Sequence, residues 1–150
     1  MSILLIAFLL QYFAVSFAGS PWATPDFVVL GMVLSLARSP QRWLFIAAAV
    51  AGMMLLWAIR FSALLAVGTL GLGALLAWAA GRWDFSDRRV LLIAVGSAAL
   101  SMNGLMIWSE DLWTWMTVLL LGTRVFLTAV CFYCVYPFWK KFIPASYLHG

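Results

Sequence analysis

Six apolar runs follow one another along the chain, separated by short stretches of charged residues, prolines and polar residues. They cover residues 2–18, 26–37, 43–59, 61–80, 90–108 and 112–138. None of them alternates with the two-residue period of a barrel strand, and a backbone surrounded by lipid has to satisfy its hydrogen bonds within its own segment. The pattern therefore predicts an all-α bundle of about six helices, in a single domain that covers residues 1–150.

Two of these runs leave alternatives open. A membrane-spanning helix needs about 20 apolar residues, and the run 26–37 is shorter than that. It could gain length from "SPWATPD", lie tilted among other helices, or be re-entrant, entering and leaving the membrane on the same side. The run 2–18 has no positively charged segment before it, so we expect a mature first helix and not a cleaved signal peptide.

The composition is that of an integral membrane protein. Hydrophobic residues make up 66% of the chain and charged residues only 9%, and the mean hydropathy is +1.06. A chain of this size with so few polar residues cannot cover a water-soluble surface. Its basic residues are scattered between the apolar runs, which argues against nucleic-acid binding and indicates that they set the topology in the lipid bilayer.

With six crossings and a cytoplasmic N-terminus, the basic residues separate by side. The cytoplasmic side receives Arg38, Arg42, Arg82, Arg88, Arg89, Lys140 and Lys141, and the other side receives Arg60 together with Asp26, Glu110 and Asp111. This split favours six spans with both termini in the cytoplasm. If 26–37 does not cross, an arrangement with the N-terminus outside has almost as good a charge count.

Helices in lipid associate through close packing, so we expect small residues on the contacting faces. Candidates recur four residues apart: Ala48 and Gly52; Gly73, Ala77 and Gly81; Ser97 and Ser101. The nine tryptophans all fall near predicted helix ends, where indoles prefer the headgroup level. We interpret most of them as interfacial anchors.

The residues that carry enzyme chemistry are scarce. Cys131 and Cys134 lie inside an apolar run without a second Cys or His pair, the single histidine is His149, and no Asp or Glu falls in the cores of the six runs. Metal binding and acid–base catalysis need several such groups in one pocket. We expect no catalytic residue, no metal and no cofactor. The polar residues inside the runs are Gln11, Ser35, Ser62, Thr69, Ser97, Ser101, Asn103, Thr117, Thr123, Arg124 and Thr128.

Arg124 is the exception, because an arginine near the middle of the bilayer needs a partner for its charge. We consider Asn103, backbone carbonyls freed near Gly122, or a carboxylate on another subunit. In the alternative, the last helix breaks at "LGT" and Arg124 lies at a wet surface.

Residues 11 to 57 resemble the MreD family, small polytopic proteins of the bacterial rod-shape system. The similarity rests on a first helix ending near "LLQ", on "TPDFVVLGMVLSLA", on the turn "RSPQR" and on "AVAGMMLLW"; near the C-terminus "YPFWKKF" also resembles the family. The spacing from Pro25 to Pro40 and Gly52 fits as well. After Gly52 the chain departs from the family, because Met53 to Trp57 stand where an acidic residue is common.

The resemblance implies a non-catalytic scaffold of the bacterial inner membrane. Such proteins bind the membrane helix of MreC and help couple MreB filaments to the enzymes of lateral peptidoglycan synthesis. Asp26, Arg38, Arg42 and Arg124 would then be contact residues. Two other classes remain open: an accessory subunit of another membrane complex, and a solute-binding protein similar in size to vitamin-uptake S components.

Overall fold

The computed structural model describes residues 2–38, 63–85, 87–109 and 113–141. This part of the chain is all-helical, as the sequence predicted. Its elements are α1 (Ser2–Ala18), a short 3-10 turn η1 (Pro21–Ala23), α2 (Phe27–Arg38), α4 (Ala63–Ala80), α5 (Arg88–Ser109) and α6 (Trp115–Lys141). These helices match five of the six apolar runs to within a few residues. The run 43–59 and Arg42 lie outside the described residues.

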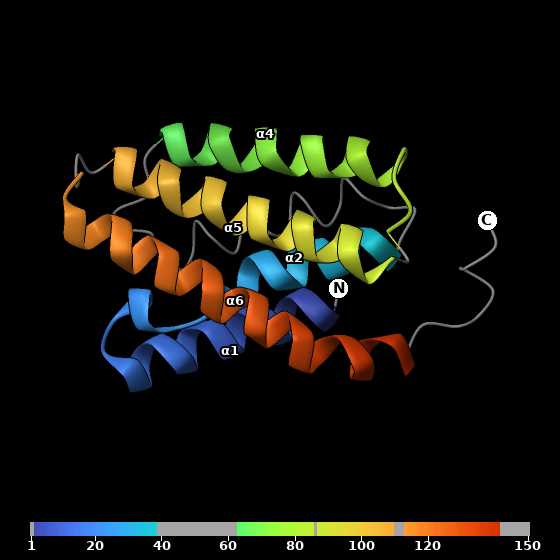
Figure 1. Cartoon of the computed structure of the whole chain (residues 1–150), viewed down its shortest axis with the longest axis horizontal. Helices are drawn as coiled ribbons and strands as arrows, with labels where there is room; N and C mark the ends of the chain where they lie inside the picture. Colours follow the sequence, from blue (N-terminus) through green and yellow to red (C-terminus); the bar gives the residue numbers. More distant parts are fainter. Residues whose placement is uncertain (1, 39–62, 86, 110–112, 142–150) are drawn as a thin grey trace.

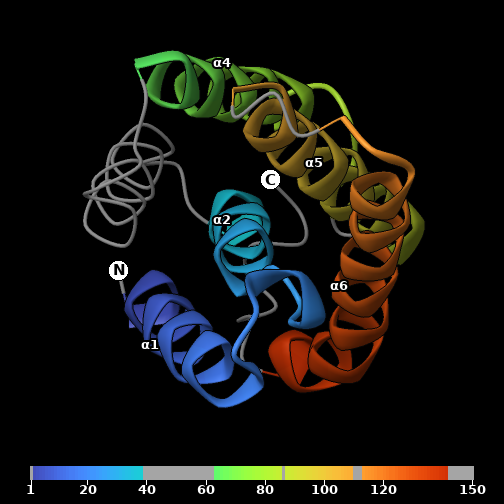
Figure 2. The ribbon, with the colours of Figure 1, turned by 90° about the vertical axis from the view of Figure 1, so that its left-hand side faces the viewer.

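The helices lie side by side along the long axis of the molecule (Figure 1). Viewed from its end, the bundle has α2 in the middle, with α1, α4, α5 and α6 around it (Figure 2). Every residue from Val28 to Leu36 is buried. A helix that is apolar on all sides is stable when protein or lipid surrounds it, and for α2 the surrounding helices take that role, so "FVVLGMVLSLA" needs no polar stripe.

The core forms where α2 packs against α5 and α6. Val29, Val33 and Leu36 of α2 belong to one cluster with Leu91 and Val95 of α5. Phe132 of α6, which is fully buried, joins the same cluster. Close packing of these side chains on several neighbouring helices holds α2 in place, although it is only 12 residues long.

Two of the described helices are long and apolar enough to cross a membrane, α5 over Arg88–Trp108 and α6 over Trp115–Lys141. The apolar stretches of α1, α2 and α4 are shorter. Helix α6 has 27 residues and is therefore about 40 Å long at 1.5 Å per residue. It runs without a break through Leu121, Gly122 and Thr123, so the alternative in which the helix breaks at "LGT" is wrong.

Small residues do pack between helices, but only some of the predicted ones. A Cβ at Gly68 of α4 would lie 2.5 Å from Leu105 Cδ1 of α5, so the two helices are close there. Gly73 is buried, as expected. Ser97 and Ser101 face outward, and the buried small residues of α5 are instead Ala94, Ala98 and Ala99. Alanine packs without burying a hydroxyl group that needs a partner.

One end of the bundle collects the basic residues. Helices α4 and α6 end there and α5 begins there (Figure 1, right-hand side). Helix α2 also ends there, at Arg38. Within the described ranges, every lysine and arginine except Arg124 lies at or beside these helix ends. The residues that do so are Arg38, Arg82, Arg88, Arg89, Lys140 and Lys141.

Candidate functional site: a buried polar network

The site begins where the chain enters α2. A helix start leaves backbone N–H groups without partners inside the helix, and away from water these groups must be satisfied by other means. Asp26 satisfies one of them, because its Oδ1 accepts a hydrogen bond from Val29 N at 3.1 Å. This is an N-cap, and the sequence "TPD" before an apolar run is a typical signal for one.

Side chains from two other helices satisfy two further backbone N–H groups at this helix start. Asp26 N donates to Thr128 Oγ1 of α6 at 2.8 Å, and Phe27 N donates to Gln11 Oε1 of α1 at 2.8 Å. Gln11 Nε2 also reaches Thr24 Oγ1 at 3.4 Å. The Thr128 hydroxyl in turn donates to Arg124 O at 2.7 Å. Buried backbone groups outside a helix need hydrogen-bond partners, and these contacts supply them.

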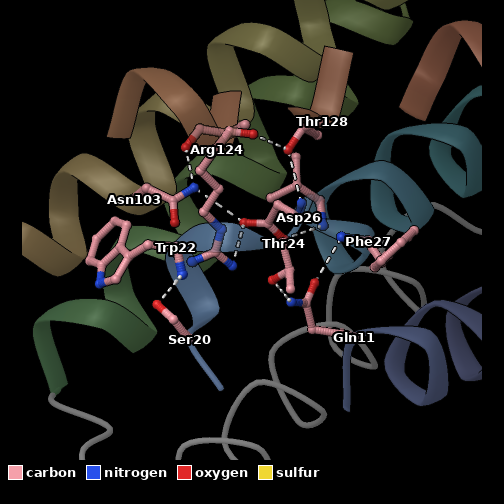
Figure 3. A network of polar contacts seen from close by, with 11 residues as sticks. Gln11, Ser20, Trp22, Thr24, Asp26, Phe27, Asn103, Arg124 and Thr128 are labelled. Atoms are coloured by element: carbon pink, nitrogen blue, oxygen red, sulfur yellow. Dashed lines mark hydrogen bonds and ion pairs between the residues drawn. The ribbon is translucent and has the colours of Figure 1, made fainter. Parts of the chain in front are cut away.

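The Asp26 carboxylate is also the partner of Arg124. Arg124 Nη2 lies 3.5 Å from Asp26 Oδ2, and Asn103 Nδ2 of α5 donates to the same oxygen at 3.2 Å. Asn103 Nδ2 also lies 2.7 Å from Ala99 O. Figure 3 shows the three side chains pointing toward one another from α2, α5 and α6. Asp26, Asn103 and Arg124 are 3%, 2% and 4% exposed, so the pair is shielded from water.

The network pairs one negative side chain with one positive side chain, but some of its polar atoms have no hydrogen-bond partner. Asp26 receives three donors, whereas Arg124 Nε and Nη1 have no hydrogen-bond partner in the described part of the chain. The ring of Trp22, from η1, lies 5.8 Å from Arg124 Cζ and adds a cation–π contact. Trp22 was expected to be an interfacial anchor; the structure instead places it beside the buried charge.

Three of the five predicted site residues therefore meet in one place: Asp26, Asn103 and Arg124. Arg38 lies at the opposite end of α2, and Arg42 lies outside the described residues. One expectation needs correction, because Asp26 is buried although the sequence pattern placed it outside the apolar cores, on the non-cytoplasmic side. Of the two alternatives for Arg124, the structure favours the polar contact over the wet surface. The carboxylate that answers Arg124 belongs to the same chain.

Sequence reasoning missed how Gln11, Thr24 and Thr128 take part. Gln11 and Thr128 stood out as polar residues inside apolar runs, but spacing along the chain does not show which helices meet. Thr128 is one helical turn after Arg124, which places both on the same face of α6. That spacing is the one signal that could have joined them.

The network joins four segments that are distant in sequence. It ties α1 through Gln11, the start of α2 through Asp26, α5 through Asn103 and α6 through Arg124. Among the described residues, no three His, Cys, Asp or Glu side chains lie close enough to hold a metal ion. Cys131 and Cys134 are free thiols, half-buried and exposed. The arrangement is suited to fixing the positions of the helices.

Comparisons with protein-family models, with curated proteins and with solved structures found no match for the chain. The function is therefore argued from the geometry described above.

Proposed function

We propose that the chain is a non-catalytic scaffold of the bacterial inner membrane, which binds membrane helices of partner proteins on the outer face of α6. In this proposal the bundle crosses the membrane six times with both termini in the cytoplasm. The basic end supports that orientation, because Lys and Arg accumulate on the cytoplasmic side. The run 43–59 supplies the crossing that falls outside the described residues.

The observation that carries the proposal is the outer face of α6. Only 22% of the apolar 18-residue segment of α6 is buried inside the chain, compared with 44% of the corresponding segment of α5. Apolar residues at helical spacing form an exposed stripe on α6, which we define as Trp115, Leu119, Gly122, Phe126 and Val130.

Gly122 lies in the middle of this stripe. A Cβ added there would meet nothing within 4 Å, so its lack of a side chain brings no benefit inside the chain. A glycine in a helix interior costs about 1 kcal/mol relative to alanine. Glycines on outward faces allow the backbone of a second membrane helix to approach closely. A partner helix seated on the α6 stripe accounts for this glycine.

The resemblance to MreD suggests which partner to expect. The segment "TPD", on which the resemblance partly rests, is the segment that caps α2 and holds Arg124. If the family relation holds, the partner is a bitopic MreC-like protein of the cell-shape and peptidoglycan-elongation machinery. The alternative is an accessory subunit of another membrane complex, which would use the same stripe with a different partner.

Co-purification tests the proposal. The full chain is extracted from its native membranes in mild detergent, and the proteins that accompany it are identified by mass spectrometry. Gly122→Leu adds a side chain in the middle of the stripe, where glycine has none. It should abolish partner binding while the chain stays folded. Gly71→Leu is the matched control, because Gly71 is also exposed and open but lies on α4, outside the α6 stripe on which the proposal seats the partner.

Three outcomes separate the candidates. Shape-determining proteins that are recovered with the wild type and with Gly71→Leu, but lost with Gly122→Leu, support the MreD-like scaffold. A different stable set of partners with the same dependence on Gly122 supports the accessory subunit. A chain that purifies alone would overturn both.

A further inference from the structure

We infer that the start of α5 and the end of α6 together bind the phosphate group of an anionic phospholipid. The site is a basic cluster of Arg88, Arg89, Lys140 and Lys141, all of them exposed. The inference rests on the proposal that the helices span a membrane, but it does not depend on a partner protein.

Antiparallel packing of α5 and α6 brings these residues together. Arg88 Cζ, at the start of α5, lies 3.9 Å from the centre of the Tyr133 ring and 5.6 Å from that of Tyr136, both on α6. Lys140 follows Tyr136 by four residues, which is one helical turn or about 6 Å along the axis. Lys141 follows at the next position. Lys140 therefore follows the two rings that hold Arg88 by about one turn, from Tyr136, and about two turns, from Tyr133.

Stacking fixes Arg88 without using its hydrogen bonds. A guanidinium group contacts an aromatic ring through its flat face, while its N–H donors lie in the plane and stay available for an oxyanion. Tyr133 is 48% exposed, so this contact lies at the surface. The side chain is held at the surface in an orientation that suits a phosphate.

The charge of the cluster is only partly compensated inside the described part of the chain. Its four cationic side chains outnumber the two carboxylates just before α5, those of Asp84 and Asp87, which both lie near Tyr136. Asp87 Oδ1 already accepts a hydrogen bond from Arg89 N at 2.8 Å. The first turn of α5 adds the partial positive charge of a helix N-terminus. An anion with several acceptor oxygens would relieve this excess.

The surroundings favour a phosphate that is attached to acyl chains. Phe138 of α6 and Trp83, between α4 and α5, are 65% and 55% exposed at the same end of the bundle. Large aromatic side chains next to basic ones at the end of apolar helices are typical of the boundary between headgroups and acyl chains. An anionic lipid would place its phosphate on the cluster and its chains against the apolar sides of α5 and α6.

Native mass spectrometry of the purified full chain tests this inference. The protein is titrated with phosphatidylglycerol and, separately, with phosphatidylcholine of the same acyl chains. We expect the wild type to bind phosphatidylglycerol about tenfold more tightly or better, because each basic residue near an anionic headgroup contributes about a fivefold factor. The variant Arg88→Gln/Lys140→Gln/Lys141→Gln should lose this preference. Arg82→Gln is the control, since Arg82 is exposed at the same end but lies over a ring of α4, that of Trp78, and not over the α6 rings that hold Arg88.

Each outcome is decisive. A preference that survives in the triple variant, or is absent from the wild type, overturns the inference, as does equal competition by millimolar inorganic phosphate. Carbonate extraction of the same proteins from membranes separates this result from the proposed function. A chain that stays in the membrane but shows no lipid preference refutes the lipid site alone, whereas a chain released by carbonate refutes the membrane-spanning proposal.

Discussion

The Thr128 hydroxyl bonds two backbone groups at once, accepting from Asp26 N and donating to Arg124 O. Replacing it with valine keeps the shape of the side chain but leaves Asp26 N buried without a partner. Such a group costs about 1–3 kcal/mol. We expect Thr128→Val to lower the free energy of unfolding by this amount, measured by denaturant titration in detergent.

Thr123→Val is the control for this change. Thr123 is on the same helix and its hydroxyl donates only to Leu119 O, at an exposed position. We expect its effect to stay within about 0.5 kcal/mol of zero. Equal effects of the two variants would contradict the capping role of Thr128.

The Asp26–Arg124 pair makes a second residue-scale prediction. Asparagine is as good an N-cap as aspartate, so Asp26→Asn removes the charge while it keeps the helix start. It leaves the Arg124 charge buried and unpaired, which costs about 3–5 kcal/mol. Arg124→Gln in turn leaves the Asp26 carboxylate buried and unpaired. The double variant should therefore be destabilised by less than the sum of the two single effects. Purely additive effects in the same titration would show that the two charges do not interact.

Residue identities alone indicated that Arg124 needs a partner, with Asn103 as one candidate and a carboxylate on another subunit as a second. They did not indicate that Asp26 is that partner. Its position beside Pro25, at the edge of an apolar run, is equally typical of an exposed turn. Only the packing of α2 in the centre of the bundle turns this N-cap into a buried carboxylate.

At the scale of helices, hydrophobic runs predicted the described elements well, because a run of apolar residues between breakers is both a helix signal and a membrane signal. They did not predict which faces meet. Ser97 and Ser101 have the spacing of a packing stripe, yet they face outward, because Ala94, Ala98 and Ala99 already give α5 a face of small side chains. Pairwise packing depends on the neighbours, which the periodicity of one helix does not contain.

The contact between α4 and α5 gives a prediction at this scale. Gly68→Leu forces a side chain into Leu105, whose Cδ1 would lie 2.5 Å from the new Cβ. Overpacking of this kind costs about 1–3 kcal/mol. Gly71→Leu, one turn later, meets nothing within 4 Å and gains helix propensity of up to about 1 kcal/mol. Thermal unfolding in detergent should therefore shift in opposite directions for the two variants, and a shift of Gly71→Leu as large and negative as that of Gly68→Leu would contradict the packing.

For the whole molecule, the account predicts one orientation in the membrane. In a variant with Cys131 and Cys134 replaced by serine, a new cysteine at Thr114 should react with an impermeant maleimide added to intact spheroplasts. A cysteine at Lys141 should react only after the membrane is permeabilised, because the proposed orientation places the basic end in the cytoplasm. Labelling in the reverse order would show that the orientation is inverted.

The central claim is that partner helices bind the outer face of α6, and site-specific photo-crosslinking in living cells tests it most directly. A benzophenone amino acid is placed at Phe126, in the middle of the α6 stripe, or at Leu75 on α4; these side chains are 67% and 66% exposed. The account predicts a discrete adduct with another integral membrane protein from position 126, and no such adduct from position 75. No protein adduct from position 126, or the same adducts from both positions, would contradict it.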